Sequence, residues 1–176
     1  MSKIYVDEIL PKDNSTISAP NLDIPAGTII QQVHSRSTTD ITISGTAGWV
    51  SVFTGTITPK YANSKIYIEM SLAHGVRSSG EHQFDHRIYS SNSTDYTHAL
   101  TSGGGSSKYD VTRHSVQGGG AHWHSRFVGY EELNMGSITE ITYDFQIYNP
   151  ATSYPDIRVN FSGRAASVMT IQEIKV

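Results

Sequence analysis

The sequence contains no cysteine, and charged residues occupy only 16% of its 176 positions, against about 25% in an average globular protein. The absence of cysteine excludes disulfides, zinc ribbons, iron–sulfur clusters and cysteine nucleophiles. A chain of this length can bury one hydrophobic core without disulfides or metal sites to stabilise it. We therefore expect one domain, with room for a short appendage.

Clusters of positive charge are also missing. The 13 Lys and Arg residues never stand next to each other, and 16 acidic residues bring the net charge to −3. A basic groove therefore has no basis in the composition, and we expect no nucleic-acid partner. Residues 1–8 bring acidic side chains where a signal peptide needs an apolar stretch, and no apolar run approaches the roughly 18 residues of a membrane span. We expect synthesis in a cytoplasm, no signal peptide and no membrane insertion.

Short β-rich segments dominate what is present. The chain has 15 Gly and 10 Tyr, many Ser, Thr and β-branched residues, and no window typical of a long helix. Turn signals separate the segments. The expected strands are 28–34, 49–58, 65–73, 81–89, 109–116, 122–130, 138–148, 156–161 and 166–175.

Two of these segments alternate clearly between apolar and polar residues, so every second side chain should face a core. The inward residues would be Ile66, Ile68, Met70 and Leu72 in one segment, and Ile141, Tyr143, Phe145 and Ile147 in the other. The number and spacing of strands favour an all-β fold. We predict an antiparallel β-sandwich of jelly-roll type over residues 28–176.

Residues 1–27 are predicted to form an extended N-terminal arm. Three prolines, Pro11, Pro20 and Pro25, remove backbone donors from any strand ladder there. The apolar residues are too few to form a core of their own, so the arm needs a partner surface. They are Ile4, Tyr5, Val6, Ile9, Leu10, Ile17, Leu22 and Ile24.

Loops rich in Gly and Ser, at 74–80, 90–108 and 117–121, are candidates for a recognition surface or for plain connection. Tyrosines lie close to them. Exposed tyrosines make good contacts to sugars or proteins, and the alternative is packing in the core or at its rim. The candidate contact residues are Tyr89, Tyr96, Tyr109 and Tyr130.

A His-x-His pattern is the sharpest metal candidate. His122 and His124 should share one face of a strand with Arg126. Two ligands do not close a site in a single chain. In a trimer, a strand near the threefold axis would supply six imidazoles, which suits iron or nickel. The alternative is surface or hydrogen-bonded histidines, and Arg126 argues against a cation; we otherwise expect no cofactor.

Catalytic patterns are missing from the sequence. The segment 103–108 lacks the spacing and the ending of a phosphate loop, and no nucleophile elbow occurs. Glu131 and Glu132 are adjacent, so a strand would direct them to opposite faces. We expect no enzymatic activity.

Three segments resemble small virion proteins of marine tailed phages, including those of cyanobacteria. They are the opening residues 1–9, the strand entry at 57–68 with its Thr58-Pro59 and Ser64-Lys65-Ile66, and the closing strand 168–174. The order and spacing of all three carry the resemblance, which covers about a fifth of the chain. Residues 74–136 resemble no family in this way.

The resemblance implies a non-enzymatic virion protein, usually a homotrimer, whose arm docks to other virion proteins. A tail fibre or tail-tip protein that contacts a host surface glycan or protein is the first expectation. A capsid decoration or head-fibre protein is the second. A carbohydrate-binding module or depolymerase fragment is the alternative from another class.

Overall fold

The protein folds into two antiparallel β-sheets. The computed structural model describes residues 24–45, 48–76, 80–92, 110–116, 122–149, 156–161 and 165–176. The strands in these ranges are β1 (Ile29–Ser37), β2 (Ile41–Ile43), β3 (Val50–Ile57), β4 (Lys65–Val76), β5 (Gly80–Ser90), β6 (Asp110–Val116), β7 (His122–Glu132), β8 (Ile141–Tyr148), β9 (Ile157–Val159) and β10 (Ser167–Ile174). The predicted all-β antiparallel sandwich is confirmed, and no described helix is long and apolar enough to span a membrane.

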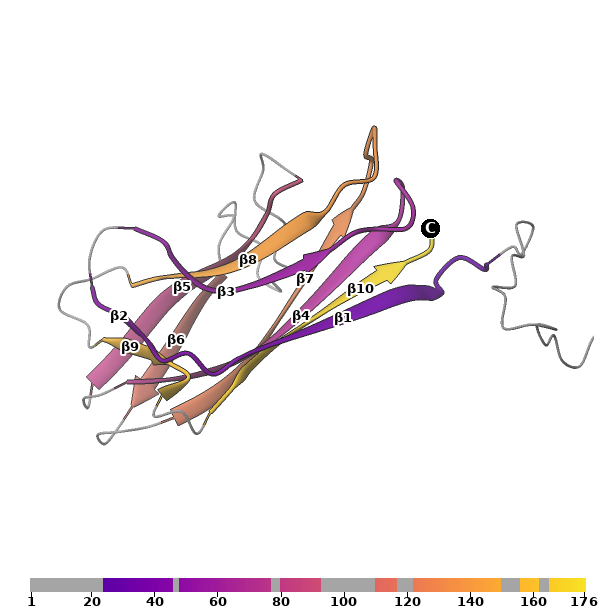
Figure 1. Ribbon diagram of the computed structural model, residues 1–176. Helices are drawn as coiled ribbons and strands as arrows, with labels where there is room; N and C mark the ends of the chain where they lie inside the picture. Colours follow the sequence, from indigo (N-terminus) through magenta and orange to yellow (C-terminus); the bar gives the residue numbers. More distant parts are fainter. Residues whose placement is uncertain are drawn as a thin grey trace, which may run out of the picture.

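The long strands pair in a nested order. Among the eight strands of seven or more residues, the first pairs with the last (β1 with β10) and the second with the seventh (β3 with β8). The third pairs with the sixth (β4 with β7) and the fourth with the fifth (β5 with β6). Further pairing of β4 with β10 and of β5 with β8 completes two sheets. β1, β10 and β4 run side by side, with β3 and β8 across from them (Figure 1).

The first sheet, which contains β1, β10, β4 and β7, also holds the two short strands. β9 pairs with the far end of β4, beyond the part that pairs with β10, and β2 pairs with β9. The second sheet has the order β3-β8-β5-β6.

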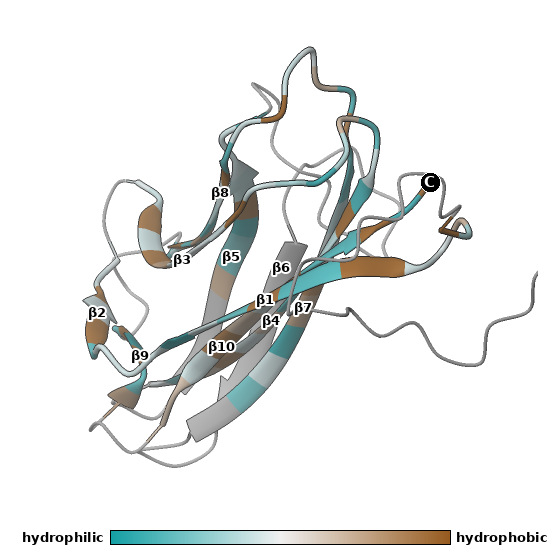
Figure 2. Cartoon of the chain, turned by 45° about the vertical axis from the view of Figure 1, so that its right-hand side comes forward, coloured by the Kyte–Doolittle hydropathy of each residue, from teal (hydrophilic) through white to brown (hydrophobic). Residues whose placement is uncertain are grey.

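The core lies between the sheets. All eight side chains that the alternation placed inward on β4 and β8 are fully buried, so that prediction is confirmed. Hydrophobic and hydrophilic residues interleave along the strands, as Figure 2 shows. The two layers approach closely at Gly55 of β3, where a side-chain carbon would lie 3.0 Å from Ile171 Cδ1 and Met169 Sδ. The absence of a side chain at Gly55 thus lets β3 pack directly on β10.

The strand predictions differ from the structure in several places. β1 extends to Ser37 rather than to 34, β7 extends to Glu132 rather than to 130, and β9 covers only Ile157–Val159 of the expected 156–161. β8 begins at Ile141 rather than at 138, and Ile138 is 48% exposed. β4 continues through residues 74–76, which the sequence assigned to a loop, because this end pairs with both β7 and β9. β2 was missed, since three residues are too short for alternation to mark a strand.

A buried carboxylate joins β10 to the connection between β3 and β4. Glu173 is fully buried. Its oxygens accept hydrogen bonds from the backbone N–H groups of Lys60, at 2.8 and 2.9 Å, and of Tyr61, at 3.0 Å. Ser64 Oγ donates at 2.7 Å, and Gln31 Nε2 donates from β1 at 2.7 Å. We call these five residues the Glu173 clasp.

Asn160 is a second polar hub. It is buried with a φ of 55°, a left-handed conformation that Asn tolerates better than most residues. Its Nδ2 donates to Thr39 O at 3.1 Å, and its Oδ1 accepts from Ser167 Oγ at 2.7 Å. Its backbone N–H donates to Ala73 O at 2.9 Å. Asn160 therefore fixes the end of β9 against three other segments.

Replacement of Asn160 by Ala should lower the free energy of unfolding by about 2 kcal/mol, because Thr39 and Ser167 each lose a partner and the left-handed backbone becomes strained. Asn160→Gly should cost about 1 kcal/mol less than Asn160→Ala, since glycine adopts positive φ without strain. Urea denaturation of the two variants measures the difference. A glycine variant less stable than the alanine variant would contradict this account.

Candidate functional site

Polar and aromatic side chains gather on the outer face of the second sheet. Asp144 of β8 is half-buried there. Ser51 Oγ donates to its Oδ1 at 2.6 Å, and Gln146 Nε2 donates to its Oδ2 at 2.6 Å. These two hydrogen bonds fix the orientation of the carboxylate.

Arg87 of β5 extends this arrangement to the aromatic residues. Its Nε donates to Gln146 Oε1 at 2.6 Å. Its guanidinium carbon lies 4.4 Å from the centroid of the Trp49 ring, a cation–π contact. The Trp49 and Tyr148 ring centroids are 5.6 Å apart. Three strands therefore contribute to one connected set of side chains.

Tyr89 and Asp85 belong to the same face. Tyr89 is 37% exposed and lies opposite Asp144 in the register of β5 and β8. Asp85 lies opposite Tyr148. Burial raises the pKa of Asp85 above its ordinary value. We define the Asp144 patch as Trp49, Ser51, Asp85, Arg87, Tyr89, Asp144, Gln146 and Tyr148.

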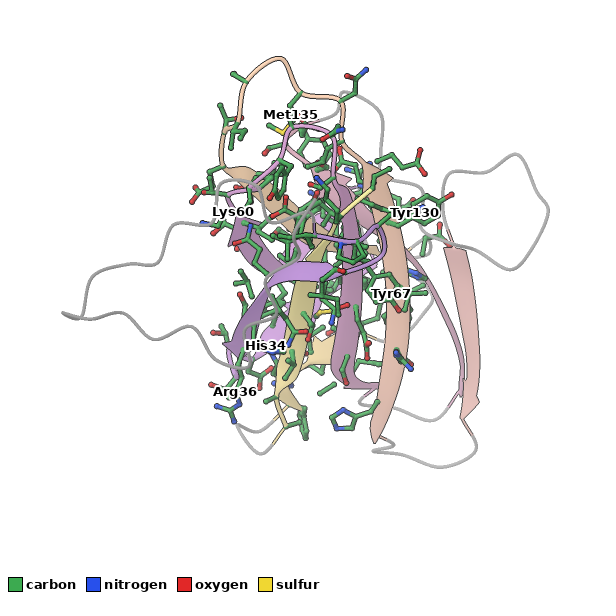
Figure 3. All side chains as sticks on the ribbon, turned by 90° about the vertical axis from the view of Figure 1, so that its right-hand side faces the viewer. His34, Arg36, Lys60, Tyr67, Tyr130 and Met135 are labelled. Carbon is green, nitrogen blue, oxygen red and sulfur yellow. The ribbon has the colours of Figure 1, made fainter. Side chains whose placement is uncertain are left out.

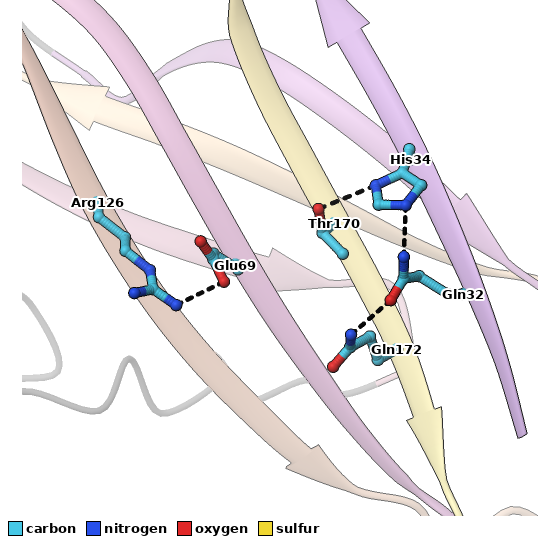
Figure 4. A network of polar contacts seen from close by, with 6 residues as sticks. All are labelled: Gln32, His34, Glu69, Arg126, Thr170 and Gln172. Carbon is cyan, nitrogen blue, oxygen red and sulfur yellow. Dashed lines mark hydrogen bonds and ion pairs between the residues drawn. The ribbon is translucent and has the colours of Figure 1, made fainter. Parts of the chain in front are cut away.

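The outer face of the first sheet carries a different polar network (Figure 4). Gln172 Nε2 donates to Gln32 Oε1, Gln32 contacts His34, and His34 Nδ1 lies 3.1 Å from Thr170 Oγ1. These four residues link β1 to β10. The network is a cross-strand ladder of amide, imidazole and hydroxyl groups whose members bond one another.

Ion pairs occupy the other half of this face. Arg126 Nη2 of β7 lies 2.7 Å from Glu69 Oε2 of β4, also drawn in Figure 4. The hydrogen bond and the charge of Glu69 raise the pKa of Arg126. Lys65 Nζ lies 3.1 Å from Glu132 Oε1 and 4.6 Å from the centroid of the Tyr130 ring. Each of these pairs joins β4 to β7.

The predicted contact tyrosines do not form a single surface within the described chain. Tyr89 lies on the outer face of the second sheet, whereas Tyr130 lies on the outer face of the first sheet, opposite Tyr67 in the register (Figure 3). Because the core separates these two faces, Tyr89 and Tyr130 cannot contact the same small ligand. Tyr96 and Tyr109 lie outside the described residues.

The His-x-His segment takes the predicted strand position in β7. His124 is exposed and shares its face with the exposed Arg126, as the alternation predicted. His122 is in the same strand, but its side chain lies outside the described part of the structure. Within that part, no group of three or more His, Asp or Glu residues is placed to hold a metal ion. A site shared between chains remains a prediction.

The adjacent glutamates point to opposite faces, as expected. Glu132 is exposed, whereas Glu131 points between the sheets and accepts hydrogen bonds from Tyr143 Oη at 2.6 Å and Ser90 Oγ at 2.9 Å. Asn92 Nδ2 donates to Glu131 at 3.0 Å. Burial, together with the charge of Glu131, raises the pKa of Tyr143 well above its ordinary value. Glu131 therefore joins β7 to β5 and β8.

Only the last arm residue with a predicted docking role lies in the described chain. Ile24 is half-buried. Shortly after it, Gly27 N–H donates to Lys175 O at 2.8 Å, and Lys175 N–H donates to Thr28 O at 2.9 Å. Gly27 has a φ of 85°, which favours glycine. The chain thus joins the sandwich at Gly27. The other docking residues lie outside the described ranges: Ile4, Tyr5, Val6, Ile9, Leu10, Ile17 and Leu22.

Most residues of the Asp144 patch were not predicted from the sequence. Alternation along 81–89 places Asp85, Arg87 and Tyr89 on one face, but of these only Tyr89 was predicted as a contact residue. The sequence does not show that β8 pairs with both β3 and β5. This pairing brings Ser51, Asp144 and Arg87 together. Polar residues at every second position of β8 were the available signal.

Comparisons with known proteins identify no family for this chain. The sequence matches no protein-family model and no curated protein. Among solved structures, the chain is similar to one in "Structure of infectious bursal disease virus Gt strain", with a TM-score of 0.28 and 10% identity over 91% of this chain and 45% of that one. The corresponding match to the Gx strain has a TM-score of 0.26 and 12% identity over 91% and 41%. This chain spans less than half of either, and likeness at these TM-scores leaves function to be argued from the chain's own residues.

Proposed function

We propose that this chain is a non-enzymatic structural protein of a virus particle. More finely, we propose a homotrimeric tail fibre or tail-tip protein of a tailed phage, located in the virion. Its N-terminal arm docks to other virion proteins, and its sandwich faces the host surface.

The nested strand order is the observation that carries this proposal. Pairing of first with last, second with seventh, third with sixth and fourth with fifth is the arrangement of a jelly roll. Viral capsid domains and lectin domains commonly use this architecture. Because a fold hosts many functions, the assignment to a phage particle rests on the sequence resemblance described above.

The Glu173 clasp supports that resemblance. Two of the three resembling segments, 57–68 and 168–174, are far apart in the sequence. Glu173 of the second bonds to Lys60, Tyr61 and Ser64 of the first. The two segments therefore form one structural unit in this fold.

The buried Glu173 and the half-buried Glu131 favour a role without catalysis. A glycosidase needs two carboxyl groups that face each other across a cleft. Glu131 and Glu173 instead accept hydrogen bonds from protein donors that join strands. Both side chains are thereby committed to holding the sandwich together.

The proposal predicts a trimer and a dispensable arm. Light scattering should give the purified chain three times the mass of one chain. Deletion of residues 1–23 should leave the melting temperature nearly unchanged, because the hydrogen bonds of Gly27 and Thr28 to Lys175 lie outside the deleted segment and stay in place. Unfolding of the truncated chain would show instead that the arm belongs to the core.

Labelling of particles tests the location. An antibody raised against the chain should decorate purified phage tails in electron micrographs, and a chain without residues 1–23 should fail to enter particles. Labelling spread over the capsid would replace the tail role by capsid decoration. Particles without the chain would overturn the virion role.

A further inference from the structure

We propose that the Asp144 patch binds an uncharged carbohydrate. This inference names the chemistry of the host contact and so rests on the proposed attachment role. It places the contact on the outer face of the second sheet rather than on the Gly/Ser loops.

The patch offers aromatic surface. Tyr89 is 37% exposed, and Trp49 and Tyr148 lie beside each other with ring centroids 5.6 Å apart. Flat rings of this kind present an apolar face against which the C–H face of a sugar ring can pack. Sites for small ligands typically combine such rings with a few fixed polar groups.

The polar groups beside these rings are held in place before any ligand binds. Asp144 receives one hydrogen bond on each oxygen, from Ser51 and from Gln146, and Arg87 in turn holds Gln146. Each carboxylate oxygen can accept a second hydrogen bond. Asp144 can therefore accept from two neighbouring hydroxyl groups of a sugar without reorganisation, which lowers the entropic cost of binding.

The charge of the patch selects the class of carbohydrate. Asp85 and Asp144 outweigh the single guanidinium of Arg87, and the whole chain has a net charge of −3. A uronate or sialate would meet like charge, whereas an uncharged hexose polymer would meet only acceptors, donors and rings.

The outer face of the first sheet is a poorer candidate. Four of its charged groups form the pairs Arg126–Glu69 and Lys65–Glu132. Its Tyr130 ring lies under Lys65 at 4.6 Å, much as Trp49 of the Asp144 patch lies under Arg87 at 4.4 Å. The advantage of the patch is therefore the 37% exposed ring of Tyr89. This face therefore supplies the matched control, Tyr67, a half-buried tyrosine on the opposite side of the core.

An array of purified bacterial O-antigen and capsular polysaccharides, some uncharged and some rich in uronic acid, tests the inference. The full chain should bind at least one uncharged polysaccharide. Tyr89→Ala and Asp144→Asn should each weaken that binding by about tenfold or more, through the lost ring contact and the lost charged acceptor. Tyr89→Phe, which keeps the ring, and the control Tyr67→Ala should bind within about twofold of the wild type.

Melting curves confirm that each variant is folded before it is scored. The inference is overturned if no uncharged polysaccharide binds, if only uronate polymers bind, or if Tyr67→Ala is as impaired as Tyr89→Ala. Particle labelling separates the two proposals. A chain found in tails that binds no polysaccharide refutes this site alone, whereas a chain that binds polysaccharide but is absent from particles refutes the virion role alone.

Discussion

Glu173→Gln is expected to destabilise the protein by about 3 kcal/mol or more, since an amide replaces a buried carboxylate that accepts several hydrogen bonds. In the wild type, Lys60 N–H donates to both oxygens, Ser64 donates to Oε1 and Gln31 to Oε2. The amide of a glutamine can present only one acceptor atom, and its NH₂ group would face donors. The urea midpoint should fall accordingly.

Glu132→Gln is the matched control. Glu132 has the same chemistry, but its side chain is 72% exposed and forms an ion pair with the partly exposed Lys65. Exposed pairs contribute little, so the change should cost less than about 0.5 kcal/mol. Equal losses in the two variants would show that Glu173 does not act through the clasp.

Acidification should destabilise the fold through His86. The ring of His86 is 2% exposed and lies among aromatic rings, with its centroid 4.1 Å from that of Phe127 and 5.6 Å from that of Phe145. Burial lowers its pKa from 6.5 to about 4. Between these two pH values the unfolded chain binds a proton at His86 and the folded chain does not. The contribution of the neutral His86 to the free energy of unfolding is therefore fully present above pH 6.5. It falls by about 3 kcal/mol as the pH drops toward 4.

A His86→Leu variant isolates this contribution. Leucine fills a similar apolar site and does not titrate, so the variant should lose markedly less stability than the wild type between pH 7 and pH 4.5. Chemical denaturation at a series of pH values provides the comparison. Parallel pH profiles for the two proteins would mean that other groups cause the acid sensitivity.

The strands were predictable because strand formation leaves a local trace. The alternation in 65–73 and 138–148 placed eight inward side chains correctly. Local patterns did not reveal the role of Glu173, whose position between Ile171 and Ile174 gave no sign of its distant partners. Its bond to Gln31 joins residues 142 positions apart, and a period of two carries no information over such a separation.

The candidate site also combines residues that local patterns identify with contacts that only strand pairing creates. The sequence predicted both Tyr89 and Tyr130 as candidate contact residues, and only strand pairing placed them on opposite sides of the core. Similarly, Ser51, Arg87 and Asp144 lie in three separate segments that meet because β8 pairs with both β3 and β5.

Residue composition and local alternation were sufficient to predict the all-β class, the positions of most strands and the inward face of the most regular ones. These properties depend on residue composition and on neighbours two positions apart. Only the tertiary structure decided the nested strand order, the Glu173 clasp and the Asp144 patch. Each depends on which distant strands pair, and pairing is set by the packing of the whole core between the two sheets.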